Sequence, residues 1–310
     1  MVWQFQLDAG GEMRTIPYSA AKSDLFTPWM RDDYFSNGEA KATASFAAEL
    51  SRLAYCRKPP SRSFDSDKIR SVLAAIGFSD CRFFESSGAT SKGTHCFSAI
   101  GTDQGSGRRI GIVSFRGTDA DDPTDIGDDA DIILMPWKDG SKVHTGFAKA
   151  LAEIQPALDD AVTAIGLPIL FTGHSLGAAL ATLVASLFGS MTNGSALCTF
   201  GSPLVGNSEF AAIFDGMKME VQRYVDCCDV VTRVPPSELG YAHIAQPQYI
   251  DRDGHITVNP QESFILSDRL AAEADYLLHY SWKVGNVGIR DLADHAPINY
   301  VRAVTAGNNV

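Results

Sequence analysis

The feature that most restricts the fold of this chain is a serine placed between two glycines, where a short apolar strand meets a helix. The chain runs Pro-Ile-Leu-Phe-Thr over residues 168–172, turns through Gly173-His174-Ser175-Leu176-Gly177, and continues as Ala-Ala-Leu-Ala-Thr-Leu-Val-Ala. Glycine has no Cβ, so it lets the strand and the helix approach each other closely at this turn. The pattern is typical of a nucleophile elbow, which exposes the hydroxyl of Ser175 above a sheet.

Composition places the chain among ordinary globular proteins and excludes several kinds of partner. Its 310 residues are 45% hydrophobic and 20% charged, which is enough for a sizeable core without disulfides. The net charge of −11 disfavours nucleic acids and anionic membrane surfaces. Apolar runs are too short to span a bilayer, and residues 1–20 lack the apolar stretch of a signal peptide. We therefore expect no stable membrane insertion, and a cytoplasmic protein, or a secreted one if a signal peptide was removed.

The order of elements predicts an α/β protein. Strands are expected at 196–200 and 221–225, and hairpins at 95–100 with 110–115 and at 248–251 with 255–258. A helical stripe from Phe147 to Ile165 is expected to bend at Pro156. Strands that alternate with helices predict a mostly parallel sheet covered on both faces. Because no linker divides the chain, we expect a single domain over 1–310, with 1–45 as a surface-wrapping N-terminal extension.

A serine hydroxyl needs an imidazole base to act as a nucleophile at neutral pH. In elbow enzymes the base lies downstream of the serine, which leaves four histidines. His295 precedes the last helix in a turn and is the favoured base, with His243 second. His255 lies in a tight hairpin, and His279 is expected to be buried in the core within Leu-Leu-His-Tyr.

The imidazole must in turn be held by a carboxylate. Asp226 and Asp229 both follow the strand that ends at Val225. Asp229 is the better candidate because it opens the apolar segment Asp-Val-Val-Thr-Arg-Val-Pro-Pro, whose prolines would keep the carboxylate dry and fixed.

Six blocks in the same order resemble the class 3 lipase family of fungal triacylglycerol lipases and feruloyl esterases. These blocks lie between about Ala47 and Tyr300: Ser-Phe-Arg-Gly-Thr (114–118), Val-His-Thr-Gly-Phe (143–147), Thr-Gly-His-Ser-Leu-Gly (172–177), Thr-Phe-Gly-Ser-Pro-Leu-Val-Gly-Asn (199–207), the acidic block 229–236, and Asp294-His295 with Tyr300. The resemblance implies an α/β-hydrolase fold and a serine carboxylic-ester hydrolase that acts on acylglycerols or on short- to medium-chain esters through an acyl-enzyme.

The resemblance also assigns roles to individual residues. It implies Ser175 as nucleophile, His295 as base and then acid, and Asp229 as the residue that orients His295. The backbone N–H groups of Thr118 and Leu176 would form the oxyanion hole, and His144 and His174 would have structural roles. No cofactor and no metal are expected, because this chemistry needs neither.

The segment between Thr118 and His144 departs from the family, whose true lipases have an apolar helical lid there. Seven of the thirteen residues at 119–131 are aspartates. A solvated acidic flap is the favoured interpretation and a calcium loop the alternative, although the Asp-x-Asp-x-Asp-Gly pattern is absent. The apolar residues 132–135 and Trp137 would pack in the core or line the cleft.

The acidic segment argues against a substrate that must be bound at a lipid surface, because burying its charges there would be unfavourable. The class of ester substrate therefore stays undecided. We expect an esterase or lipase with weak interfacial activation. The alternatives are a feruloyl-type aryl esterase, a phospholipase, and a lipase-like interaction module without catalysis.

Overall fold

The computed structural model describes residues 16–36, 43–59, 63–86, 93–103, 106–118, 132–217 and 219–306. The helices and strands of these residues are, in chain order, α1 (Lys22–Phe26), α2 (Thr43–Leu53), β1 (Arg57–Lys58), β2 (Ser63–Phe64), α3 (Ser66–Ala75), β3 (Phe78–Glu85), β4 (His95–Thr102), β5 (Arg109–Phe115), β6 (Leu134–Pro136), β7 (Lys142–His144), α4 (Thr145–Ala152), α5 (Gln155–Ile165), β8 (Ile169–His174), α6 (Leu176–Phe188), β9 (Ala196–Phe200), α7 (Ser208–Asp215), β10 (Glu220–Asp226), β11 (Pro247–Ile250), β12 (Ile256–Val258), α8 (Glu262–His279), α9 (Arg290–Asp294) and α10 (Pro297–Ala306).

The centre of the fold is an eight-stranded sheet in the order β12-β11-β10-β9-β8-β5-β4-β3. The five strands from β11 to β5 pair in parallel, whereas β12, β4 and β3 pair antiparallel with their neighbours. The mostly parallel sheet and both hairpins expected from the sequence are confirmed. Because the parallel strands share a direction, their carboxyl ends meet at one edge of the sheet, where ligands of such folds bind.

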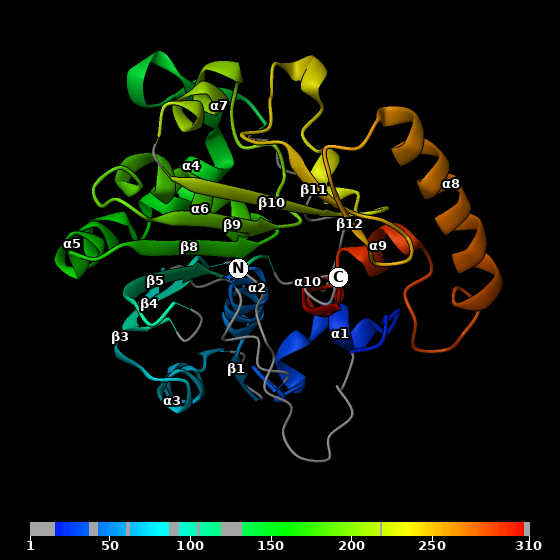
Figure 1. Cartoon of the computed structure of the whole chain (residues 1–310), viewed down its shortest axis with the longest axis horizontal. Helices are drawn as coiled ribbons and strands as arrows, with labels where there is room; N and C mark the ends of the chain where they lie inside the picture. The colour runs from blue at the N-terminus through cyan, green and yellow to red at the C-terminus, as the bar shows by residue number, and fades with distance from the viewer. Residues whose placement is uncertain are drawn as a thin grey trace.

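Helices cover both faces of the sheet, and each face has its own core (Figure 1). Helices α4, α5 and α6 pack on one face, where Phe171 of β8 and Leu197 of β9 are fully buried. Helices α2 and α10 pack on the other face against Leu170 and Phe200. Strand β8 is buried on both faces, so its apolar residues are continuous rather than alternating.

One expected helix is two helices in the structure. The stripe from Phe147 to Ile165 divides into α4 and α5, with Pro156 in the first turn of α5. Proline lacks a backbone N–H, and the N–H groups of the first helical turn have no partner within the helix. Pro156 therefore begins a helix instead of bending one.

Helix α8 differs most from expectation. His279 is not buried in the core, since its side chain is 61% exposed and pairs with Asp275 on the surface. The neighbouring leucines, Leu277 and Leu278, are 60% and 71% exposed. Figure 1 shows α8 at the rim of the molecule, beyond the ends of β11 and β12. None of the helices in the described ranges is long and apolar enough to cross a bilayer.

The described part of the N-terminal region packs against the rest of the chain. Ile16, Ala20 and Leu25 are buried in the same core as α10. The side-chain amide of Asn299 donates to the backbone oxygen of Ser19 at 2.8 Å. The division into one domain with an N-terminal extension stays a prediction.

Candidate active site

Ser175 lies at a strained turn between β8 and α6. Its φ is 58° and its ψ is −130°, a conformation that is costly for a residue with a side chain. A Cβ on Gly173 would overlap the backbone of Gly177, and a Cβ on Gly177 would overlap the backbone oxygen of Phe115. Only glycine fits at both positions, so the elbow expected from the sequence has a steric cause. The side chain of Ser175 is 2% exposed, and no described residue forms a hydrogen bond with its Oγ.

The end of β5 lies directly beside this turn. A Cβ on Gly117 would lie 2.6 Å from the backbone oxygen of His174 and 3.0 Å from Cβ of Ser175. Thr118, the next residue, is partly buried. Leu176 is the first residue of α6, and the N–H groups of a first helical turn have no partner within the helix. The two expected oxyanion donors therefore come from the end of β5 and from the start of α6, the two segments next to Ser175.

Asp229 and His295 are in direct contact although 66 residues separate them. Nδ1 of His295 lies 3.0 and 2.9 Å from the two carboxylate oxygens of Asp229. Because a carboxylate only accepts, Nδ1 is the protonated nitrogen and Nε2 is free to accept a proton. The carboxylate also accepts from the N–H of Val231 at 2.9 Å and from the hydroxyl of Tyr300 at 2.5 Å. Both Asp229 and His295 are buried.

His174 connects the elbow to His295. The two imidazole rings pack with centroids 4.5 Å apart, and Nε2 of His174 donates to the backbone oxygen of His295 at 2.8 Å. Its Nδ1 accepts from the hydroxyl of Tyr55 at 2.8 Å. Burial, with His295 nearby, lowers the pKa of His174 well below its usual value, so the ring stays neutral. No hydrogen bond joins Ser175 Oγ to His295, and apo sites often tighten only when substrate binds.

A buried ion pair fixes the backbone before His295. Asp294 accepts from Nε of Arg290 at 3.1 Å, from the backbone N–H of Cys228 at 3.0 Å and from the hydroxyl of Tyr18 at 2.8 Å. Burial raises the pKa of Asp294, and these donors oppose the rise. Asp226, the other acid considered, is also buried, and burial together with Asp294 raises its pKa. Asp226 makes no contact with His295 comparable to that of Asp229.

The remaining histidines lie outside this arrangement. Nε2 of His243 donates to the backbone oxygen of Thr232 at 2.9 Å, and burial, aided by Arg223, lowers its pKa to about 3. His255 is exposed and contacts Asp251. Nδ1 of His144 accepts from the N–H of Gly146 at 3.1 Å and thereby caps α4.

Two groups among the described residues have metal-ligating atoms close together: Cys227, Cys228 and Asp294, and Asp251, Asp253 and His255. In the first group the oxygens of Asp294 already accept three hydrogen bonds, and all six cysteines of the chain are free thiols. In the second, Oδ1 of Asp251 accepts from two N–H groups of its own turn. Neither group is arranged around a vacant ligand position. The acidic segment 119–131, with its flap and calcium-loop interpretations, lies outside the described residues.

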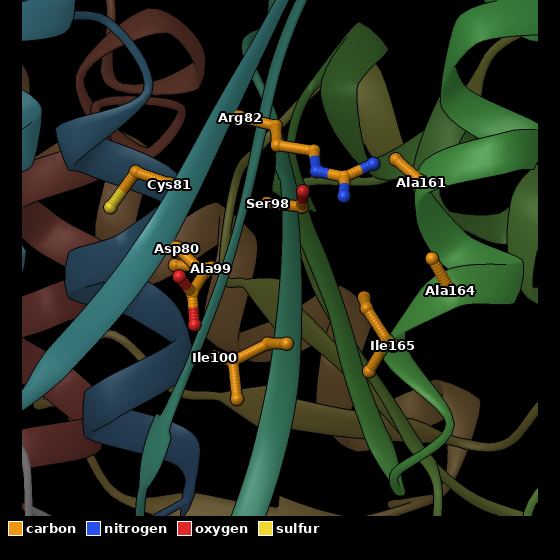
Figure 2. Close-up of a pocket in the computed structure, with 9 residues that line it drawn as sticks. All are labelled: Asp80, Cys81, Arg82, Ser98, Ala99, Ile100, Ala161, Ala164 and Ile165. Carbon is orange, nitrogen blue, oxygen red and sulfur yellow. The ribbon is translucent and has the colours of Figure 1, made fainter.

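A hollow of about 410 Å³ lies away from Ser175, between the sheet edge and α5 (Figure 2). Arg82, Ser98 and Ile100 extend from β3 and β4 toward Ala161 and Ile165 of α5 (Figure 2). Ile100 pairs with Gly111, which pairs with Ile169 at the start of β8, whereas Ser175 follows the end of β8. The hollow therefore lies near the amino ends of the parallel strands, whereas Ser175 lies at their carboxyl ends, so the hollow is separate from the candidate active site.

Comparison with known proteins gives one consistent result. Residues 112–239 match the family described as Lipase (class 3). The chain is 35% identical over 117 residues to secreted mono- and diacylglycerol lipase 1 of Fusarium solani, covering 36% of this chain and 35% of that protein. It is 32% identical over 191 residues to phospholipase A1-II 1 of Oryza sativa subsp. indica, covering 50% of this chain and 47% of that protein. The matches thus span between a third and a half of these relatives.

The fold resembles that of a lipase from Rhizopus microsporus var. chinensis, with a TM-score of 0.52 and 25% identity over 69% of this chain and 75% of that chain. The α/β-hydrolase fold expected from the sequence is confirmed. Sequence reasoning missed the contributions of Tyr55 and Tyr18, because each lies far along the chain from the motif that it supports, and it also missed Arg290, which pairs with Asp294 four residues later. The roles of Ser175, Asp229, His295, Thr118 and Leu176 stay predictions.

Proposed function

We propose that this chain, whose residues 112–239 match the class 3 lipase family, is a serine carboxylic-ester hydrolase that acts on acylglycerols through an acyl-enzyme on Ser175. The observation that carries the proposal is the hydrogen-bonded pair of Asp229 and His295 beside the strained turn of Ser175. No cofactor takes part in the proposed reaction.

In the proposed mechanism, Nε2 of His295 takes the proton of Ser175 Oγ as this oxygen attacks the ester carbonyl. The resulting oxyanion accepts from the N–H groups of Thr118 and Leu176, each of which would lower the barrier by about 3 kcal/mol. The tetrahedral intermediate collapses as His295 protonates the leaving alcohol. A water molecule, deprotonated by the same nitrogen, then attacks the acyl-enzyme and releases the acid. Asp229 holds Nδ1 throughout, so Nε2 keeps facing the reaction.

The names of the relatives narrow the substrate. The Fusarium solani relative is a mono- and diacylglycerol lipase and the Oryza sativa relative a phospholipase A1. We therefore propose partial acylglycerols as the first substrate class and diacyl phospholipids as the second. The relative from Fusarium solani is named as secreted, which supports secretion for this chain over a cytoplasmic location.

The proposal is tested by labelling the intact protein with a fluorophosphonate probe. We expect labelling that disappears in Ser175→Ala and persists in Ser237→Ala, where an exposed serine is removed. Absence of labelling in the intact chain would support the non-catalytic interaction module instead.

Substrate class is tested by rates on dioleoylglycerol, phosphatidylcholine and methyl ferulate. We expect dioleoylglycerol to be hydrolysed fastest. A faster rate on methyl ferulate would assign the chain to aryl esters, and a faster rate on phosphatidylcholine would reverse the order of the two lipid classes.

A further inference from the structure

Helix α8 is held to the body by one face, on which Ala272 and Tyr276 are fully buried, and it leaves four leucines exposed on the other. Asp268 faces the body, where it accepts from the hydroxyl of Tyr249 at 2.9 Å and from the N–H of Arg252 at 3.1 Å. Nε of Arg269 donates to the backbone oxygen of Cys227 at 2.7 Å. A surface helix of a globular protein normally exposes charged and polar side chains on its outer face. These hydrogen bonds, with the buried Ala272 and Tyr276, fix which face of α8 points outward, and that face carries leucines instead.

The outward face of α8 is an uncharged arc rich in leucine. Leu266, Leu270 and Leu277 are each 60% exposed, and Leu278 is 71% exposed. At 100° per residue the first three fall within about 40° of one another, opposite the buried Ala272. Serines and alanines fill the rest of the arc between these leucines and Leu278, so it contains no charged side chain.

The apolar surface continues beyond the end of the helix. Trp282 is 70% exposed, and Val284 is fully exposed. The ammonium of Lys283 lies 5.8 Å from the ring centre of Trp282. Nε1 of Trp282 donates to the backbone oxygen of Leu278 at 3.0 Å, so the exposed indole adjoins the last turn of α8. Exposed apolar side chains that gather in one place mark protein or membrane interaction sites.

From these contacts and exposures, we propose that the outer face of α8, together with Trp282 and Val284, docks on the surface of a zwitterionic phospholipid bilayer. The choice of a lipid occupant rests on the proposed function. The chain would lie on the bilayer, with the leucines among the acyl chains and Trp282 and Lys283 at the headgroups.

The charges around the leucine arc favour a lipid surface without net charge over anionic lipids and over a second copy of the chain. The flanks of the arc carry the carboxylates of Glu273 and Asp275, and the chain has a net charge of −11. Anionic lipids would repel such a surface. A second copy docked through the same face would bring these carboxylates opposite their equivalents, which is unfavourable. An uncharged apolar ridge bordered by acids fits a lipid surface without net charge.

The position of α8 relates the docking face to the active site. Its inner residues contact Cys227, two residues before Asp229, and Tyr249 at the end of β11. Ser175 follows the end of β8, which is parallel to β11 within the same sheet. Docking through α8 would therefore hold the edge of the sheet that contains Ser175 near the lipid.

The test uses the full chain with Ser175→Ala, so that the vesicles are not hydrolysed. Flotation with phosphatidylcholine vesicles should show binding that falls at least about tenfold in Leu270→Glu and in Leu277→Glu. The matched control is Met191→Glu, since Met191 is 56% exposed in the turn after α6, and it should bind normally. Vesicles should shift the fluorescence emission of the chain to shorter wavelength, and Trp282→Phe should lose most of that shift.

Several outcomes would overturn the proposal. The first is that the chain does not bind phosphatidylcholine vesicles, or binds only anionic ones. The second is that the leucine variants bind vesicles as well as the chain with Ser175→Ala alone. The third is that the chain forms a dimer that Leu270→Glu dissociates. Hydrolysis of a water-soluble p-nitrophenyl ester by the chain with Ser175 intact separates the two proposals. Hydrolysis without vesicle binding refutes docking alone, whereas vesicle binding without hydrolysis refutes the proposed function alone. The leucine variants should hydrolyse the soluble ester at the unchanged rate.

Discussion

His174 donates a hydrogen bond from Nε2 to the backbone oxygen of His295, so the residue before the candidate nucleophile holds the backbone of the candidate base. Because the carbonyl can only accept, Nε2 carries the proton, and Nδ1 must accept from the hydroxyl of Tyr55. The elbow and the turn before α10 are thus joined through one neutral imidazole.

Replacing His174 should therefore impair catalysis without removing a reacting group. In His174→Phe a phenyl ring takes the place of the imidazole, and both hydrogen bonds are lost. We therefore expect kcat to fall about 10- to 100-fold with KM changed less than about threefold. Tyr55→Phe removes only the Tyr55 hydroxyl and should have a smaller effect. Steady-state kinetics on a soluble ester measure both. A variant that changed KM alone would mean that His174 affects substrate binding instead.

Tyr300 positions the carboxylate of Asp229 from within α10. Tyr300→Phe removes a hydrogen bond to a charged group, which is worth about 1.5–3 kcal/mol. We expect the kcat of this variant to fall by about tenfold or more, since Asp229 would orient His295 less well. Tyr224→Phe is the matched control, because its hydroxyl bonds Gln222 instead of the site. Equal kcat values for the two variants would contradict the role of Tyr300.

Gly201 leaves room for the contact between Asp229 and His295. Its φ is +58°, and a Cβ there would lie 2.8 Å from Oδ2 of Asp229 and 3.1 Å from Nδ1 of His295. Gly166 has a similar φ of +61°, but a Cβ there meets nothing within 4 Å. Both Gly→Ala variants should lose about 1 kcal/mol of stability through backbone strain.

Only Gly201→Ala should lose activity, because only its methyl group would push Asp229 and His295 apart. We expect at least a 100-fold drop in kcat for this variant and less than a twofold change for Gly166→Ala. Thermal unfolding monitored beside the kinetics checks that the two proteins are equally folded. Comparable activity of the two variants would argue against a steric role for Gly201.

The sequence predicted the parts of the site that depend on local chemistry. The glycines at 173 and 177 have no sterically allowed substitute, so the elbow follows from the residues themselves. The hairpins and the parallel strands follow from apolar runs bounded by turn residues. Asp229 and His295 could be paired because the order of residues in elbow enzymes restricts the choice to a few candidates.

Contacts between distant segments could not be predicted in this way. Tyr18 meets Asp294 across 276 residues, and no local pattern distinguishes it from the other tyrosines of the chain. His279 was misjudged for a related reason. Leucines beside a histidine usually indicate a buried segment, but the hydrogen bonds of Asp268 and Arg269 and the buried side chains of Ala272 and Tyr276 place the opposite face of α8 against the body.

His243 should make the stability of the fold sensitive to acid. Burial, aided by Arg223, lowers its pKa to about 3, below the value of about 6.5 expected in the unfolded chain. The folded state therefore favours neutral His243, and its stabilising contribution is complete above about pH 6.5 and is lost as the pH falls toward 3. Between pH 7 and pH 5 the loss should be about 1–2 kcal/mol, allowing for the partial exposure of the ring. Urea unfolding at the two pH values measures it, and His243→Gln should reduce the difference by this amount. The same pH dependence in the variant as in the intact chain would show that His243 titrates freely, against the burial and the 2.9 Å contact with Thr232 that hold it neutral.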